Sequence, residues 1–257
     1  MSVSRQLLPV LLSEKKNAVK GGIYNKMQVD FAYNSNRIEG NCLTYEQTRY
    51  IFETHTIGGT ASVNDVFEAA NHFRCFDYIL DTIDEPISEK LIKELHRKLK
   101  SGIITDDDSA VVGDYKKYPN TVGEITTTLP EEVSGAVRAL IEEFSHRNAV
   151  DMYDVAEFHA EFEKIHPFYD GNGRVGRLLT LKMCLQNNIV PFIISDQMKH
   201  FYYAGLNECQ IGQKYTRLID VFLESQDDMK AAFATPFIAF FRLLRLVNGG
   251  CPAFSTP

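Results

Sequence analysis

The segment 166–177 reads His-Pro-Phe-Tyr-Asp-Gly-Asn-Gly-Arg-Val-Gly-Arg and fixes a turn between two helices. Apolar residues recur at helical spacing on both sides of this segment, over 155–165 and 175–183. Its proline disfavours helical angles at His166, and its glycines permit a tight turn with exposed backbone N–H groups. We therefore expect one helix to end before His166 and a second helix to begin at residues 172–174.

The rest of the chain also shows mainly helical periodicity. The segment 113–128 is the exception, since its glycines, proline and threonines follow no helical stripe, and it predicts a short β-hairpin. Further helices are expected around 28–36, 44–54, 63–82, 91–99, 137–144, 197–208, 214–225 and 229–247.

These elements predict an all-α fold, a single helical domain with a short β-hairpin flap. Residues 1–60 are expected to form a helical extension packed on the core. The core itself would span 61–226, and residues 227–257 would form a C-terminal helix and tail.

Charge and cysteine content exclude several classes of function. The formal net charge is -7 and the pI is about 5.5, which leaves no broad basic field for nucleic acid. The five cysteines are scattered and form no Cys-x-x-Cys pair, which argues against a disulfide framework or a zinc site. The apolar run 7–12 is too short for a signal peptide, and arginines and a proline interrupt 233–247. We expect a cytoplasmic protein without a membrane span.

The segment 166–177 also holds the side chains that a metal-bound polyphosphate needs. The helix that begins near its end presents free N–H groups and a positive dipole, which together attract anions. Arg174 and Arg177 are three residues apart, so both are expected on one face, where guanidinium groups can bind successive phosphates. A carboxylate at Asp170 is compatible with phosphate when a cation such as Mg²⁺ lies between them. The neutral imidazole of His166 can accept a proton.

Each of these features has an ordinary structural explanation, and only their joint occurrence favours a functional site. A lone histidine beside an apolar run is usually structural, and a pair of arginines usually lies on the surface. The run Gly171-x-Gly173-x-x-Gly176 also matches a dinucleotide fingerprint, with Asp196 twenty residues further on. That fingerprint requires a buried strand upstream, but residues 157–165 are charged and helical in period. We therefore set the dinucleotide interpretation aside.

The segment resembles the signature of Fic-domain proteins, H-P-F-x-[D/E]-G-N-G-R-x-x-R, at every fixed position. The resemblance extends over most of residues 30–225. It implies the helical Fic fold and transfer of AMP from ATP to a Ser, Thr or Tyr hydroxyl of a target protein, with release of pyrophosphate. Relatives that phosphorylate their targets carry a lysine in place of Gly173, so the glycine here favours AMP transfer.

The resemblance also implies a role for each residue of the segment. His166 would be the general base, Asp170 would hold Mg²⁺ against the α- and β-phosphates, and Arg177 would meet the γ-phosphate. Phe168 would anchor the loop in the core. The anion hole would be formed by Gly171, Asn172, Gly173 and Arg174.

The resemblance also implies roles for residues outside the segment 166–177. The hairpin would pair with an extended target segment, although many relatives carry arginine where this chain has Lys116. In the pair Tyr202-Tyr203, Tyr203 would lie beside the nucleotide; a core aromatic stripe is the alternative for both tyrosines. Gln210 would reach the adenine. The flap residues expected at the target are Lys116, Thr121 and Val122.

A second pattern lies upstream, where 35–41 resembles the inhibitory motif [S/T]-x-x-x-E-[G/N] of the family. Glu39 would then pair with Arg177, displace the γ-phosphate and keep the enzyme inactive, with Ser35 as the first residue of the motif. The alternative is an ordinary helix end at Gly40 with Glu39 exposed. Glu39 could also position a water molecule that removes AMP from modified targets.

The sequence thus predicts an autoinhibited protein adenylyltransferase that uses ATP and Mg²⁺ and acts on a target protein and on itself. The alternatives are removal of AMP, transfer of another nucleotide or phosphate group, and a helical interaction module that only binds nucleotide. Homodimers are common in this kind of fold by analogy, but the sequence leaves the oligomeric state open. No residue pattern identifies the target or the signal that releases Glu39.

Overall fold

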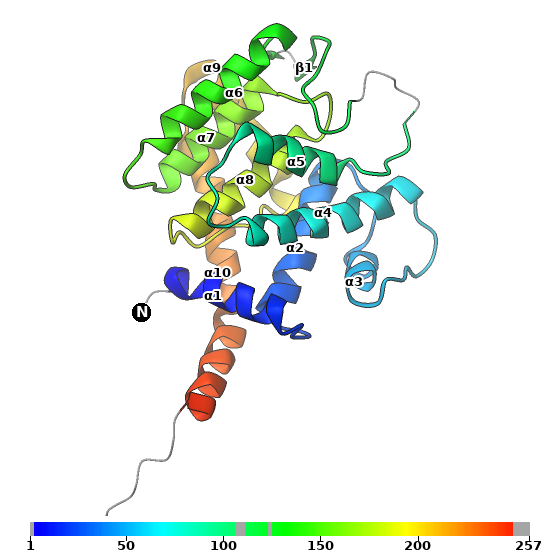
Figure 1. Cartoon of the computed structure of the whole chain (residues 1–257), viewed down its shortest axis with the longest axis vertical. Helices are drawn as coiled ribbons and strands as arrows, with labels where there is room; N and C mark the ends of the chain where they lie inside the picture. Colours follow the sequence, from blue (N-terminus) through cyan, green and yellow to red (C-terminus); the bar gives the residue numbers. More distant parts are fainter. Residues whose placement is uncertain (1–2, 106–110, 123–124, 249–257) are drawn as a thin grey trace, which may run out of the picture.

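Figure 1 shows a computed structural model of the chain, in which helices surround one central helix and a small hairpin lies at one end. The structure describes residues 3–105, 111–122 and 125–248. The expectation of an all-α fold with a short hairpin is confirmed. The α-helices of the described part are α1 (Val3–Lys16), α2 (Ile23–Ile38), α3 (Tyr45–Thr54), α4 (Val63–Asp81), α5 (Glu89–Leu99), α6 (Pro130–Ser145), α7 (Met152–Ile165), α8 (Asn172–Gln186), α9 (Lys199–Gly212) and α10 (Thr216–Asn248). The 3-10 helix is η1 (Asp196–Met198), and the strands are β1 (Thr121–Val122) and β2 (Ile125–Thr126).

The turn between α7 and α8 has the predicted form. A capping box at Asp151 begins α7, because its side chain accepts hydrogen bonds from two backbone N–H groups of the first turn. The helix ends at Ile165, and His166 takes a left-handed conformation with φ of 50°. Gly171, with φ of 85°, turns the chain into α8, which begins at Asn172.

Helix α8 lies at the centre of the fold and carries the second half of the segment 166–177. It contacts α7, α4, α5, α1 and α2. Apolar residues from Leu7 to Met229 form a continuous core around it. The N-terminal end of α8 is therefore held by elements from distant parts of the chain.

The hairpin of β1 and β2 is fixed to the turn of the motif. The strands pair antiparallel, with Thr121 opposite Thr126 and Val122 opposite Ile125. Lys116, just upstream, donates its backbone N–H to the Pro167 carbonyl at 2.9 Å. Its ammonium group is bonded to Thr127, Asn120 and the Ile165 carbonyl, and the residue is only 3% exposed. Lys116 thus ties the hairpin to the motif.

The C-terminal helix differs from the prediction. Two helices were expected at 214–225 and 229–247, but α10 runs through both without a break. The residues between them contain no glycine or proline, and Gln226 donates a hydrogen bond to the Val190 carbonyl at 2.6 Å. In the described part of the chain, no helix combines the length and the apolar character needed to cross a membrane.

Candidate active site

A cavity of about 490 Å³ lies at the N-terminal end of α8, between the motif, the hairpin and the end of α2. Three residues expected at the site, namely Ser35, Lys116 and Arg174, do not belong to its lining. The structure brings the other predicted residues together. Those that line the cavity are Glu39, Thr121, Val122, His166, Asp170, Gly171, Asn172, Gly173, Arg177 and Tyr203.

His166 has the properties of a neutral base. Its Nδ1 lies 3.2 Å from the Glu163 carbonyl oxygen. A carbonyl can only accept, so Nδ1 carries the proton and Nε2 is left as the basic nitrogen. Burial is the main cause that lowers the pKa of His166 to about 4, although the bond to Glu163 opposes it. The imidazole is therefore uncharged near neutral pH and can take up a proton.

The loop ahead of α8 is closed by its own side chains. The Asn172 amide accepts a hydrogen bond from the Phe168 N–H at 2.8 Å and donates one to the Phe168 carbonyl at 2.9 Å. Phe168 is fully buried. After the left-handed turn at Gly171, the first residues of α8, Asn172 and Gly173, line the cavity, and the first N–H groups of a helix have no partner within it. This helix N-terminus can hold an anion.

Arg177 is paired with Ser35 of α2 and with Glu39, the C-cap of that helix. Its Nη2 lies 2.6 Å from the Glu39 carboxylate and also donates to the Ser35 carbonyl, while Nε donates to the Ser35 hydroxyl at 3.0 Å. The arginine is 2% exposed. Burial alone would lower the pKa of Arg177, but Glu39 and Tyr202 outweigh burial and raise it, so the guanidinium remains charged. Ser35 and Glu39 thus occupy the cation that the motif would offer to a phosphate.

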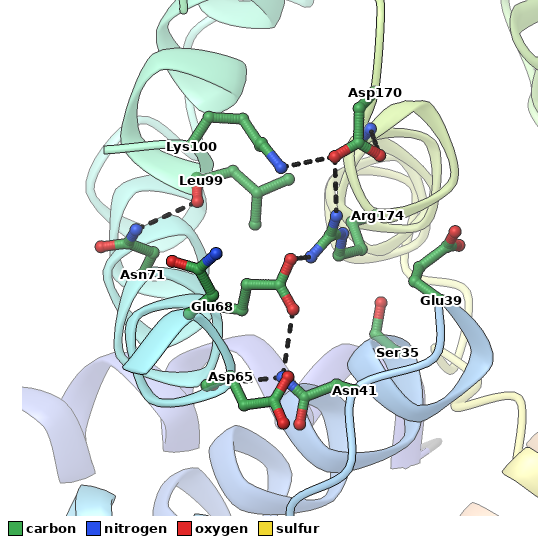
Figure 2. A network of polar contacts seen from close by, with 12 residues as sticks. Ser35, Glu39, Asn41, Asp65, Glu68, Asn71, Leu99, Lys100, Asp170 and Arg174 are labelled. Atoms are coloured by element: carbon green, nitrogen blue, oxygen red, sulfur yellow. Dashed lines mark hydrogen bonds and ion pairs between the residues drawn. The ribbon is translucent and has the colours of Figure 1, made fainter. Parts of the chain in front are cut away.

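Arg174 belongs to a separate network at the other side of the motif (Figure 2). Its guanidinium lies 2.5 Å from the Glu68 carboxylate of α4 and 3.6 Å from the Asp170 carboxylate. Asp170 in turn lies 2.5 Å from the ammonium group of Lys100. Burial would raise the pKa of Asp170, but Arg174 and Lys100 outweigh burial and lower it. Arg174, expected in the anion hole, is 2% exposed and faces these carboxylates.

Asp170 fits a magnesium site that is completed by phosphate. Its carboxylate lines the cavity beside the N-terminus of α8. Within the described residues, no group of three or more His, Cys, Asp or Glu side chains could hold a metal by itself. A cation here would therefore need phosphate and water oxygens, and this is how Mg²⁺ is usually bound in nucleotide sites.

His96 supports the motif loop from α5 and was not among the site residues expected from the sequence. Its Nδ1 accepts the Gly113 N–H at 2.9 Å, so Nε2 carries the proton and donates to the Asp170 carbonyl at 3.1 Å. The ring stacks on Phe168 with centroids 3.9 Å apart. The available signal was a histidine on the apolar stripe of a predicted helix, four residues after Ile92.

Glu163 is a second residue that the sequence did not reveal. It lies three residues before His166, is 7% exposed, and lines the cavity. Burial raises the pKa of Glu163 to about 8, so the side chain is mainly protonated at neutral pH. Its carboxyl group rests against α8 at Gly176, where a Cβ would lie 2.6 Å from Oε1.

The far wall of the cavity is formed by α9. Tyr203 lies at the cavity and is 40% exposed. Tyr202 is 1% exposed, and its hydroxyl lies 2.7 Å from Nε2 of His159 and 3.3 Å from Arg177. Of the two tyrosines, only Tyr203 offers a solvent-accessible ring to a ligand. Gln210 also lines this wall.

Comparisons with known proteins agree with this geometry. The Fic/DOC family model matches residues 86–184. The protein adenylyltransferase Fic of Nematostella vectensis is 28% identical over 203 residues, which are 77% of this chain and 45% of the relative. That of Drosophila grimshawi is 30% identical over 183 residues, 68% of this chain and 36% of the relative. The chain thus spans less than half the length of these curated relatives.

Solved structures show the same arrangement of helices. A Fic domain containing signaling protein from Bacteroides thetaiotaomicron gives a TM-score of 0.66 at 27% identity, over 90% of this chain and 92% of that one. Fic-1 from Caenorhabditis elegans gives a TM-score of 0.69 at 22% identity, over 90% and 72%, and supports the fold alone. The fold and the site define a helical protein in which the N-terminus of a helix and a neutral imidazole line the same cavity. The chain carries a Fic/DOC family domain and has the Fic fold.

Proposed function

We propose that this protein is an autoinhibited adenylyltransferase that transfers AMP from ATP to a hydroxyl side chain of a target protein. The observation that carries the proposal is the cavity itself, in which a neutral His166 faces the N-terminus of α8 and Arg177 is held by Glu39. The curated relatives bear the name protein adenylyltransferase, which agrees with this reaction.

In the proposed reaction, His166 accepts the proton of the target hydroxyl through Nε2. The hydroxyl oxygen forms a bond to the α-phosphorus, and the bond between this phosphorus and the bridging oxygen of pyrophosphate breaks. The N–H groups at the start of α8 stabilise the charge on the phosphate oxygens. When bound, Mg²⁺ would neutralise part of the phosphate charge, with Asp170 as its protein ligand.

The cavity walls indicate where the nucleoside and the target segment would bind. Tyr203 and Gln210 would contact the nucleoside. Thr121 and Val122 of β1 are at the rim, and β1 would pair with the backbone of the target segment. Lys116 would act indirectly, because its buried ammonium group holds the hairpin in place.

The proposed brake is the ion pair between Glu39 and Arg177. Because both nitrogens of this guanidinium that face α2 are bonded to Ser35 or Glu39, a γ-phosphate that binds Arg177 there would have to displace the Glu39 side chain. A bond of this type contributes about 1.5–3 kcal/mol. The N-terminal part of the chain, residues 1–60, would thus carry the inhibitory element.

The test is incubation of the parent protein and Glu39→Gly with ATP, CTP, GTP or UTP labelled at the α-phosphate, with Mg²⁺ present. We expect label from ATP on the protein itself, increased about tenfold or more in Glu39→Gly. His166→Ala in the same background should abolish the label.

Each other outcome excludes one part of the proposal. Equal labelling of the parent and Glu39→Gly would exclude the brake. Stronger labelling from another nucleotide would show that this nucleotide, and not ATP, is the donor. Binding of ATP without any label in Glu39→Gly would favour a nucleotide-binding module, and loss of AMP from a modified substrate would favour the reverse reaction.

A further inference from the structure

In the resting site, three charged side chains of the motif are each paired with a residue from a different part of the chain, and Figure 2 shows the pairs of Asp170 and Arg174. The motif side chains are one carboxylate and two guanidinium groups, so their partners have one positive and two negative charges. The partners come from α2, α4 and the end of α5. The pairs are Arg177 with Glu39 at 2.6 Å, Arg174 with Glu68 at 2.5 Å, and Asp170 with Lys100 at 2.5 Å.

The pair of Asp170 and Lys100 differs from the other two, because it occupies the carboxylate proposed to bind Mg²⁺. Lys100 is the C-terminal cap of α5, and its backbone N–H is bonded to the His96 carbonyl at 2.9 Å. Its side chain is 11% exposed, and its Cδ packs 3.5 Å from the position that a Cβ on Gly171 would take. The ammonium group is thus held at the metal-binding carboxylate by its stem and its helix.

A second cavity, of about 350 Å³, adjoins the same carboxylate on the side of α4. Lys100 and Asp170 both line it, together with the acidic side chains Asp65 and Glu68. An ammonium group displaced from Asp170 therefore has both space and other carboxylates within this cavity.

We propose that Lys100 is a resident counter-ion of Asp170 that competes with Mg²⁺ for this carboxylate, so that metal can bind only when the ammonium group moves into the adjoining cavity. The inference rests on the proposed role of Asp170 as the metal ligand. It follows from charge and geometry, because the ammonium group at 2.5 Å from Oδ2 of Asp170 repels a divalent cation that approaches this oxygen, and Oδ1 already accepts the Gly171 N–H at 2.6 Å. Lys100 thereby weakens metal binding in the resting protein and keeps the site electrically neutral.

The test measures binding of an ATP analogue with a methylene group between the α- and β-phosphates, by calorimetry, with Mn²⁺ and in excess EDTA. Lys100→Met keeps the length of the stem but removes the charge. We expect it to tighten binding in Mn²⁺ by about tenfold, or about 1.4 kcal/mol. Binding in EDTA should stay within twofold of the parent. Lys100→Arg should resemble the parent, and Lys90→Met, an exposed lysine on the same helix, is the matched control.

Two results would overturn the proposal. Unchanged binding of Lys100→Met in Mn²⁺ would show that the ammonium group does not compete with the metal. Weaker binding both in Mn²⁺ and in EDTA would show that Lys100 contacts the phosphates instead.

Asp170→Asn separates this inference from the proposed function. If Asp170→Asn loses the tightening by Mn²⁺ and Lys100→Met changes nothing, only the role of Lys100 is wrong. If Asp170→Asn binds the Mn²⁺ complex as well as the parent does, Asp170 is not the metal ligand. The inference about Lys100 is then wrong as well.

Discussion

Gly173 and Gly176 let two acidic side chains rest against the backbone of α8. A Cβ on Gly173 would collide with the Glu39 carboxylate, and a Cβ on Gly176 would lie 2.6 Å from Oε1 of Glu163. Both glycines are therefore required by close approach rather than by backbone conformation. Because the Glu39 carboxylate lies directly on Gly173, a side chain at this position would also displace Glu39 from Arg177.

The close approach at Gly176 predicts an unusual effect of alanine. In most helices, replacing glycine by alanine stabilises the protein by up to about 1 kcal/mol. At Gly176 the new methyl group would lie 2.9 Å from the His159 ring, which is bonded to Tyr202 and cannot easily move. We expect Gly176→Ala to destabilise the protein by about 1–3 kcal/mol, measured by urea denaturation.

The matched control for this prediction is Gly135→Ala. Gly135 is exposed in α6, and its Cβ position has no neighbouring heavy atom within 4 Å among the described residues. This variant should be neutral or stabilised. The same sign of change in both variants would contradict the steric argument.

At the level of elements, the hairpin is joined to the end of α7 and to the loop that follows it, in addition to the pairing of its own two short strands. Lys116 connects it to the carbonyls of Pro167 and Ile165 on either side of His166. Burial lowers the pKa of Lys116 to about 8. A target segment that pairs with β1 would therefore be placed relative to His166 through this lysine.

Removal of the lysine should loosen the hairpin. We expect Lys116→Met to increase amide hydrogen exchange in β1 and β2 by about tenfold, because Thr127 and Asn120 lose their common partner. The exposed Lys117→Met is the control and should exchange like the parent. Unchanged exchange in Lys116→Met would mean that the strand pairing alone holds the hairpin.

The sequence predicted the elements that depend on neighbouring residues. The end of α7 and the start of α8 could be placed because a proline and Gly171 act on the backbone next to them. The partners Glu68 and Lys100 could not be placed, since periodicity shows which face of a helix is buried but not what it meets. Lys100 is 70 residues from Asp170 in the chain. Glu39 was an exception, because a resemblance to the inhibitory motif pointed to it.

For the whole molecule, the main feature of the core is the number of titratable groups packed around α8. Burial lowers the pKa of His72 and His159 to about 3, and that of His96 and His166 to about 4. Burial raises the pKa of Glu163 to about 8. All five groups are therefore mainly uncharged in the folded protein at neutral pH, and each links folding to proton binding.

These shifts predict that the protein loses stability in mild acid. A histidine with a lowered folded pKa is protonated first in the unfolded state, so its contribution is present above about pH 6.5 and is lost as the pH falls towards 3–4. Glu163 acts in the opposite direction, because its raised pKa stabilises the fold most below about pH 4.5 and this contribution is lost as the pH rises through about 8. As the pH falls from about 6.5 to about 4.5, the stability lost through the four histidines exceeds the stability gained through Glu163.

We therefore expect the free energy of unfolding, measured by urea denaturation, to be lower at pH 5 than at pH 7 by about 2 kcal/mol or more. His72→Leu should reduce this difference, because His72 is fully buried against Phe31 and the leucine that replaces it takes up no proton on unfolding. The exposed His200→Gln should leave the difference as it is in the parent. Equal stability of the parent at the two pH values would show that these histidines are charged within the fold.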